Sequence, residues 1–404
     1  MADAAPAATA TAEPDWLQAR RRLGERLTGE LALPTQKDKG WEFTDLTGLD
    51  LDAYAPGPAT VEGLDPGVDG DAGVPVVLSL ADAAERLGDV VRERFGSLVP
   101  AEDPFVARNE ASWRSGLLVY VPRGQRLREP VQLAVLPPGD GAGVEWRALI
   151  VLEEGAEAEV WERYGSGGDD SEGLFNGVVE LWVGPGASLR YVCEQELSER
   201  SWVFATQRAE LERDASLDWV ALGFGSARGK VRMETKLAGQ GSTAKVTGAY
   251  AGAGVQHLDF DTTQEHAAEH TTSDLAFRGV LSDRATAVWR GMIRVDPGAQ
   301  QTDAFQESRN LLLSHDAHAD AIPGLEIEAN DVRCTHAAAV AQVDRDQLYY
   351  LRTRGLPEPQ AKRLIIDGFL QALAERTPQG PVRDALSEAL DRRLGEIIGE
   401  APLA

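Results

Sequence analysis

Short apolar segments that alternate with polar residues dominate the chain from about residue 117 onward. They are rich in Val, Leu and Trp, and Gly, Asp or Pro separates one segment from the next; examples are GLLVYVP, EWRALIVLEEG, GVVELWVGPG and TAVWRGMIRVDPG. A period of two with turn residues at such intervals is typical of β-strands and not of amphipathic helices. The pattern therefore predicts one long all-β region.

A weak repeat within this region predicts how the strands are stacked. A pair of small or turn residues followed by a strand recurs at residues 155, 186, 214, 241, 284 and 298, in steps of 31, 28, 27, 43 and 14 residues. These steps approximate multiples of about fourteen residues, which fits a solenoid of stacked strand pairs, because each unit buries its apolar face only against its neighbours. A sandwich or a closed barrel remains the alternative, since any β protein has turns at similar intervals.

Apolar residues at helical spacing flank the β region on both sides. Before it, residues 16–34 and 82–98 have this pattern, and the Gly/Asp/Pro-rich residues 56–75 between them indicate a loop. After it, residues 344–355 predict a helix that ends at Gly355, and two further helices follow. We therefore expect a mainly β chain in four parts: a disordered tail (1–13), an N-terminal helical and mixed region (14–116), a β core (117–343) and a C-terminal helical domain (344–404).

The charge balance narrows the choice of partners. Lys and Arg number 40 against 65 Asp and Glu, and the formal net charge of −25 repels nucleic acid and anionic membrane surfaces. The first residues, MADAAPAATATAEP, have neither the basic nor the apolar region of a secretion signal, and no apolar run long enough to span a membrane follows. We therefore expect a cytoplasmic protein that binds neither nucleic acid nor membrane, in which Cys193 and Cys334 are free thiols.

The usual catalytic motifs are absent from the sequence. GFGSARGKV (223–231) is the nearest approach to a phosphate-binding loop, but Phe224 stands where the leading Gly should be, and Val231 where Ser or Thr should bind magnesium. No GxSxG motif occurs, and neither cysteine has the neighbours of a cysteine protease. The chain is therefore expected neither to hydrolyse nucleotides nor to be a hydrolase of the nucleophilic type.

Two groups of histidines and one pair of carboxylates are weaker candidates for a functional site. His266 and His270 in EHAAEH, and the histidines of SHDAHAD (314–320), fit solvated turn residues better than a metal site, because neither group has the spacing of a known motif. Asp259 and Asp261 would share one face of a strand, as do the paired carboxylates of β-helical carbohydrate-active enzymes. Those enzymes are largely exported and this chain has no export signal, so that function is the weaker alternative.

One stretch, DVRCTHAAAV (331–340), holds one of the two cysteines and the last of the six histidines. On a strand, Cys334 and His336 would project from the same face. Thiolate and imidazole bind soft metal ions, but a complete site needs three or four such ligands. The pair is therefore either half of a metal site, completed by a partner chain or a folded-back segment, or a buried cysteine and a hydrogen-bonded histidine without a metal role.

Several longer segments resemble one known family. Residues 310–356 closely resemble the C-terminal signature of the SufB/SufD family of iron–sulfur cluster assembly proteins, and KDKGWEFTDLTGLDL (37–51) is similar to its N-terminal motif. NEASWRSGLLVYVP (109–122) and FRGVLSDRATAVWRGMIRV (277–295) resemble its entry into the β core and its central strands. Where SufB members carry an acidic–His–acidic run, this chain has Cys-Thr-His-Ala, which together with its length favours the SufD type. Ala337 stands where the family usually has Gly.

The resemblance implies a fold and a set of partners. The fold is a right-handed parallel β-helix flanked by an N-terminal helical region and a C-terminal helical domain. The implied function is that of a non-catalytic subunit of a SufBCD-type complex for iron–sulfur cluster assembly. Such a subunit pairs with a SufB-like paralogue through the β-helix and docks a SufC-like ABC ATPase through its C-terminal helices. A homodimer in isolation remains open.

The resemblance also implies roles for single residues. His336, with Cys334 as a second candidate ligand, would face the SufB interface and contribute to a site for iron or a transient Fe–S cluster, while no cofactor is expected to bind stably to the chain alone. The SufC-docking helices would include Tyr349, Tyr350, Arg354, Gly355 and Phe369, although these residues also fit a helix core and cap. A purely architectural subunit without contact to iron is the competing hypothesis.

Overall fold

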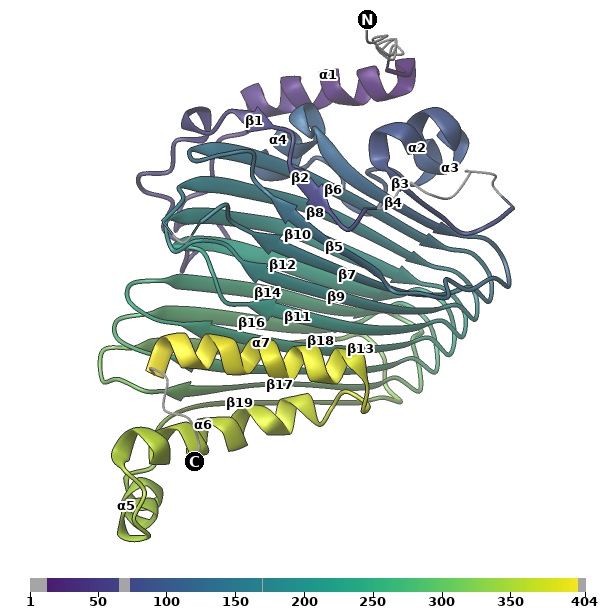
Figure 1. Cartoon of the computed structure of the whole chain (residues 1–404). Helices are drawn as coiled ribbons and strands as arrows, with labels where there is room; N and C mark the ends of the chain where they lie inside the picture. Colours follow the sequence, from purple (N-terminus) through teal and green to yellow (C-terminus); the bar gives the residue numbers. More distant parts are fainter. Residues whose placement is uncertain (1–12, 65–72, 169, 399–404) are drawn as a thin grey trace, which may run out of the picture.

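The computed structural model describes residues 13–64, 73–168 and 170–398. Two mainly parallel sheets, each with one antiparallel pair at the N-terminal end, stack face to face along most of the length of the molecule (Figure 1). In the described residues, one sheet, here called sheet A, has the order β18-β16-β14-β12-β10-β8-β6-β4-β3, with β1 beside β6. The other, sheet B, has the order β19-β17-β15-β13-β11-β9-β7-β5-β2. The strands are β1 (Pro56–Gly57), β2 (Thr60–Glu62), β3 (Val76–Ser79), β4 (Ser115–Val121), β5 (Val131–Leu136), β6 (Ala142–Leu152), β7 (Glu157–Gly165), β8 (Gly173–Val183), β9 (Ser188–Glu196), β10 (Ser201–Leu211), β11 (Ser216–Gly223), β12 (Arg228–Leu237), β13 (Thr243–Gly252), β14 (His257–His266), β15 (Thr272–Leu281), β16 (Thr286–Val295), β17 (Asp303–Leu312), β18 (His318–Ile327) and β19 (Arg333–Gln342).

Successive strands alternate between the two sheets, which defines a solenoid and not a sandwich. From β6 to β19, each strand pairs in parallel with the strand two positions earlier. The strands β12, β14 and β16 begin at Arg228, His257 and Thr286, so one full turn takes 29 residues. The repeat of about fourteen residues in the sequence is therefore one strand with its turn. The predicted mainly β solenoid between helical regions is confirmed.

Inward-facing side chains from both sheets fill the space between them, called the lumen here. The largest are aromatic and fully buried, including Trp146, Trp219, Trp289, Tyr191 and Tyr250. Because every second residue of a strand faces inward, one row of side chains lies above the next along the stack. Burial of this continuous apolar core, worth roughly 25 cal/mol per Å² of apolar surface, is what favours the stacked arrangement.

In the part of the chain that the structure describes, four α-helices cover the first turns of the solenoid: α1 (Asp15–Glu30), α2 (Leu80–Arg86), α3 (Gly88–Arg94) and α4 (Pro104–Ser112). The single helix expected over residues 82–98 is two, because Leu87 adopts a non-helical conformation directly before Gly88, a weak helix former. The loop expected over residues 56–75 contains β1 and β2, which pair with β6 and β5 at the start of the stack. Apart from Glu13, the tail predicted over residues 1–13 lies outside the described residues.

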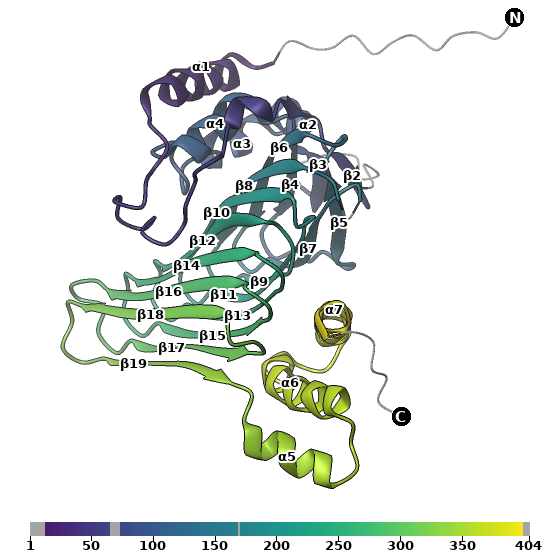
Figure 2. The ribbon, with the colours of Figure 1, turned by 90° about the vertical axis from the view of Figure 1, so that its left-hand side faces the viewer.

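Within the described residues, three helices follow the last strand: α5 (Arg345–Thr353), α6 (Glu358–Ala374) and α7 (Pro381–Ile398). The helices α6 and α7 lie on the outer face of sheet B, where Ile366, Leu370 and Leu386 pack against Val220 and Ala249. The helix α5 projects beyond the stack and buries none of its residues (Figure 2). Among the residues that the structure describes, no helix is long and apolar enough to cross a membrane.

Candidate functional site

The last turn of the solenoid is open. The strands β18 and β19 form the outermost positions of sheets A and B, so one backbone edge of each has no neighbouring strand within the described residues (Figure 2). Unpaired strand edges are templates on which another chain adds a strand. The open end of the stack is therefore the first place to look for a binding site.

Apolar side chains of this last turn lack the cover that earlier turns receive. Leu325 and Ile327 on β18 are 38% and 40% exposed, whereas their register partners on β16, Ile293 and Val295, are fully buried. Val340 on β19 is 44% exposed. Exposed apolar side chains beside free strand edges are typical of a protein–protein interface.

Cys334 and His336 lie in this last turn, on the side of β19 that faces the lumen. Their register partners on β17, Ala304 and Gln306, are buried inside the stack, which confirms that the pair shares one face. Cys334 packs against a cluster that includes Val295 and Ala304, and burial together with the charge of Asp303 raises the pKa of its thiol. His336, by contrast, is exposed at the open end.

The ligand set around this pair is incomplete. Across the part of the chain that the structure describes, no group of three or more His, Cys, Asp or Glu side chains could hold a metal ion. An iron ion or cluster with thiolate and imidazole ligands needs further donors. Cys334 and His336 therefore offer at most part of a site, which another chain would have to complete.

The structure places His266 and His270, which were considered as a metal-binding pair, in two different environments. His266 is buried in the lumen, where its ring nitrogens Nδ1 and Nε2 each lie 2.8 Å from a hydroxyl, of Thr271 and Ser273. The expectation of a solvated turn residue is thus wrong for His266, because it is the last residue of β14 and faces inward. His270 does lie in a turn, with a positive φ of 59°. The two do not form a helical metal-binding pair.

The carboxylates of Asp259 and Asp261 are held by ion pairs on the outer face of sheet A. The Lys230 Nζ lies 2.9 Å from Asp259 Oδ1 and 3.6 Å from Asp261 Oδ2, and the Thr44 hydroxyl donates a hydrogen bond to Asp259. Asp259 and Lys230 are both almost fully buried under residues 37–51, whose Trp41 ring lies 5.7 Å from the Lys230 Nζ. The N-terminal motif in the sequence is therefore a strap across the sheet, and the paired carboxylates fasten it.

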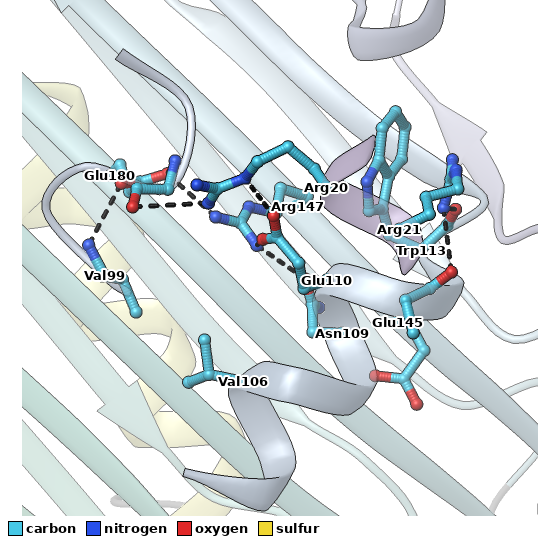
Figure 3. Close-up of polar contacts among 12 residues, drawn as sticks. Arg20, Arg21, Val99, Val106, Asn109, Glu110, Trp113, Glu145, Arg147 and Glu180 are labelled. Atoms are coloured by element: carbon cyan, nitrogen blue, oxygen red, sulfur yellow. Dashed lines mark hydrogen bonds and ion pairs between the residues drawn. The ribbon is translucent and has the colours of Figure 1, made fainter. Parts of the chain in front are cut away.

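A buried ion network, which no sequence pattern indicated, joins the N-terminal helices to the solenoid (Figure 3). Arg147 on β6 is fully buried, and its guanidinium lies 2.8 Å from Glu110 on α4 and 3.1 Å from Glu180 on β8. Arg20 on α1 also pairs with Glu110, and Glu180 accepts hydrogen bonds from the backbone N–H groups of Gly96, Leu98 and Val99. A charged residue on a strand is normally expected at the surface, so only the folded structure identifies this network.

Cys193 is a buried thiol, distant in sequence from the half-buried Cys334. Both cysteines are free thiols, as predicted from the sequence. Burial raises the pKa of Cys193 to about 12, and the Gln207 amide donates a hydrogen bond of 3.4 Å to its sulfur. At neutral pH this thiol is protonated and therefore a poor nucleophile.

The candidate partner-binding residues on the C-terminal helices fall into two groups. Tyr349 and Tyr350 on α5 are 70% and 55% exposed, and the Arg354 guanidinium donates a 3.0 Å hydrogen bond to the Tyr350 hydroxyl. Gly355 ends the helix with a positive φ of 95°, which favours glycine. Phe369, in contrast, packs on the outer face of sheet B, with the Arg278 guanidinium 5.4 Å from its ring. Of the two groups, only the first has aromatic side chains that are exposed to solvent.

Comparisons with known proteins agree with this architecture. Residues 137–369 match the family model of the SufBD core domain of the SUF system for FeS cluster assembly. The iron–sulfur cluster assembly protein SufD of Bacillus subtilis is 30% identical, over 80% of this chain and 75% of that protein. An iron–sulfur cluster assembly SufBD family protein of Mycobacterium tuberculosis is 31% identical, over 90% of this chain and 89% of the relative. SufB of Bacillus subtilis is 27% identical, over 72% of this chain and 63% of that protein. The chain belongs to the SufB/SufD family of iron–sulfur cluster assembly proteins.

Proposed function

We propose that this chain is the non-catalytic, SufD-type subunit of a cytoplasmic SufBCD-type complex that assembles iron–sulfur clusters. It pairs with a SufB-like paralogue through the open end of the solenoid and docks a SufC-like ATPase through α5. His336, with Cys334 beside it, contributes ligands to iron or to a nascent cluster at the paralogue interface. Iron and sulfide are cargo in this function and not resident cofactors of the chain.

One observation carries the proposal. The last turn leaves His336 exposed on the lumen side between two free strand edges, next to apolar residues that an earlier turn would bury. A partner that covers Leu325, Ile327 and Val340 necessarily approaches His336 as well. Its own side chains can then complete a coordination sphere that the described residues leave incomplete.

Anaerobic co-purification with the SufB and SufC equivalents, followed by iron and acid-labile sulfide analysis, tests the proposal. His336→Ala is expected to leave the stability of the chain and the assembly of the complex unchanged, because the side chain is exposed, and to lower the recovered iron and sulfide several-fold. Thr335→Ala, a neighbouring exposed substitution whose side chain faces the other side of β19, is the matched control. A His336→Ala complex with full cluster content would refute the ligand role.

A purely architectural subunit is the second candidate. It is favoured by the packing of Cys334 against an apolar cluster, where the raised pKa of the thiol disfavours the thiolate that metal binding requires. The double substitution of Cys334 and His336 by Ala separates the two candidates, because the architectural role predicts full cluster assembly by the variant complex. The carbohydrate-active enzyme receives no support, since Lys230 holds both Asp259 and Asp261.

A further inference from the structure

A small cavity lies in the lumen, about halfway along the stack. Strands β10, β12 and β14 of sheet A and β7, β9 and β11 of sheet B form its walls, and its volume is about 30 Å³. Small residues leave this space, because Ala205 on β10 and Ala221 and Gly223 on β11 line it. A Cβ atom on Gly223 would lie 2.4 Å from Cζ of the Phe260 ring, so a larger residue there requires rearrangement. The cavity is therefore built into the packing of these turns.

Gln207 on β10 belongs to the cavity wall, and its side-chain amide is only half paired. The side chain is almost fully buried, and its Nε2 donates a 3.4 Å hydrogen bond to the sulfur of Cys193 on β9. Its carbonyl oxygen Oε1 is also buried and has no hydrogen-bond partner among the described residues. Buried acceptors in native proteins are nearly always paired, with protein or with ordered water, because an unpaired one costs free energy. Gln207 therefore indicates a ligand that donates a hydrogen bond.

The Ser226 hydroxyl is a second unpaired group in the cavity wall. Ser226 lies between β11 and β12, is fully buried, and its Oγ has no hydrogen-bond partner in the part of the chain that the structure describes. Backbone hydrogen bonds fix this residue: its N–H donates to Leu197 O, and its carbonyl accepts a 2.8 Å bond from the Gln256 amide. A serine hydroxyl both donates and accepts. Two buried groups that need hydrogen-bond partners thus line one cavity.

The volume of the cavity limits the ligand to one or two very small molecules. A buried water needs about 10–15 Å³ of such space and two to four polar partners. Besides Gln207 and Ser226, the Tyr164 hydroxyl and the Cys193 sulfur belong to the cavity wall. A hard cation such as Ca²⁺ takes about six to eight oxygen ligands, more than these side chains supply. Water fits both groups, because it can donate to Gln207 Oε1 and accept from the Ser226 hydroxyl.

We propose that this cavity is a binding site for internal water, through which Gln207 Oε1 on β10 and Ser226 Oγ before β12 gain their missing hydrogen bonds. One water donates to the Gln207 carbonyl, a second bonds the Ser226 hydroxyl, and the two bond each other. Water takes this place because Ala205 and Ala221 are too short to fill the space between the sheets. It is therefore part of the folded structure at this level, and its removal leaves two buried polar groups unpaired.

A crystal structure of the full chain, at a resolution that shows ordered water, tests the site directly. Density for water is expected within hydrogen-bond distance of Gln207 Oε1 and of Ser226 Oγ. Gln207→Met keeps the length of the side chain and removes the amide, so the water beside residue 207 should be lost in this variant. A cavity without water in the wild-type chain would overturn the proposal, and so would direct protein partners for both side chains.

Filling the cavity gives an independent check in solution. Ala205→Val is expected to displace the water and to lower the melting temperature, because it leaves Gln207 Oε1 buried and unpaired. The decrease should be clearly smaller in the Gln207→Met background, where no carbonyl needs a partner.

Ala244→Val, in the lumen but outside the cavity wall, is the control and should lower the melting temperature equally in both backgrounds. Equal effects of Ala205→Val in the two backgrounds would overturn the water site. Should Ala205→Val not fold, the crystal structures of the wild type and of Gln207→Met decide.

Discussion

Gln306 lies directly beneath His336 in sheet B, one strand further into the stack, and its amide crosses the lumen to donate hydrogen bonds to Gly291 O at 3.3 Å and Gly324 O at 3.1 Å. This side chain links β17 to both β16 and the edge strand β18. It therefore fixes the distance between the two sheets at the turn that presents His336.

Replacing this amide is expected to loosen the last turn. Gln306→Leu keeps the volume but removes both hydrogen bonds, which should lower the free energy of unfolding by about 1–2 kcal/mol and speed hydrogen exchange in β18. Urea denaturation and hydrogen exchange measure the two effects. Gln347→Leu on the exposed helix α5 is the control, with an expected change within about 0.5 kcal/mol. Unchanged exchange in β18 would show that Gln306 does not hold the sheets together.

The ion network around Arg147 should contribute strongly to stability because it is buried. Arg147→Met leaves Glu110 and Glu180 without their shared cation in the protein interior, and the expected loss is about 3–5 kcal/mol. The surface pair of Arg123 and Glu154, 3.0 Å apart and exposed, offers a matched control. Arg123→Met should cost less than about 1 kcal/mol. Similar losses for the two variants in urea denaturation would contradict the assigned role of the buried network.

Stability should fall on the acid side through His266. Burial lowers the pKa of His266 to about 4, below the 6.5 of an exposed histidine. Between these values the unfolded chain binds more protons than the folded chain, so the contribution of His266 is complete above pH 6.5 and is lost as the pH falls toward 4. The loss is on the order of 3 kcal/mol. Denaturation at several pH values measures how the free energy of unfolding depends on pH. This dependence between pH 4 and 6.5 should be weaker in His266→Gln than in the wild type. An unchanged dependence would exclude His266 as its source.

The exposed tyrosines of α5 should affect partner binding and not folding. Tyr349→Ser with Tyr350→Ser is expected to weaken the binding of the SufC-like ATPase at least tenfold, because exposed aromatic residues often dominate interface energies. The melting temperature should stay unchanged, since neither side chain is buried. Phe369→Ala is expected to lower the melting temperature. The chains of this variant that remain folded are expected to bind the SufC-like ATPase almost normally. Isothermal titration calorimetry and thermal melts separate the outcomes.

Local patterns in the sequence predicted most of the strands and the terminal helices. Alternation and turn residues identify the strands of the β core, and the repeat of about fourteen residues indicated a solenoid because stacked units impose a constant spacing. The incorrect predictions of secondary structure concern segments whose conformation depends on contacts that sequence patterns do not show. Residues 56–62 form strands only because β5 and β6 lie beside them, and the helix at residues 82–98 breaks at Leu87.

The candidate site was predictable only in part. The shared face of Cys334 and His336 follows from the period of two along a strand. Their position in the last turn, with one side chain packed and the other exposed, depends on where the stack ends. In the strap, Thr44 donates a hydrogen bond to Asp259, which lies 215 positions further along the chain, and no local pattern reveals such a contact.

The sequence by itself determined the class of fold, the acidic surface and the family, because periodicity, composition and motifs are local properties. The tertiary structure decided which groups are buried and which edges remain free. Arg147 is an interior charge because the N-terminal helices cover its strand, and Leu325 and Ile327 are exposed because no further turn covers them. The groups that are free to bind at the open end therefore depend on where the stack of strands ends and not on any single sequence motif.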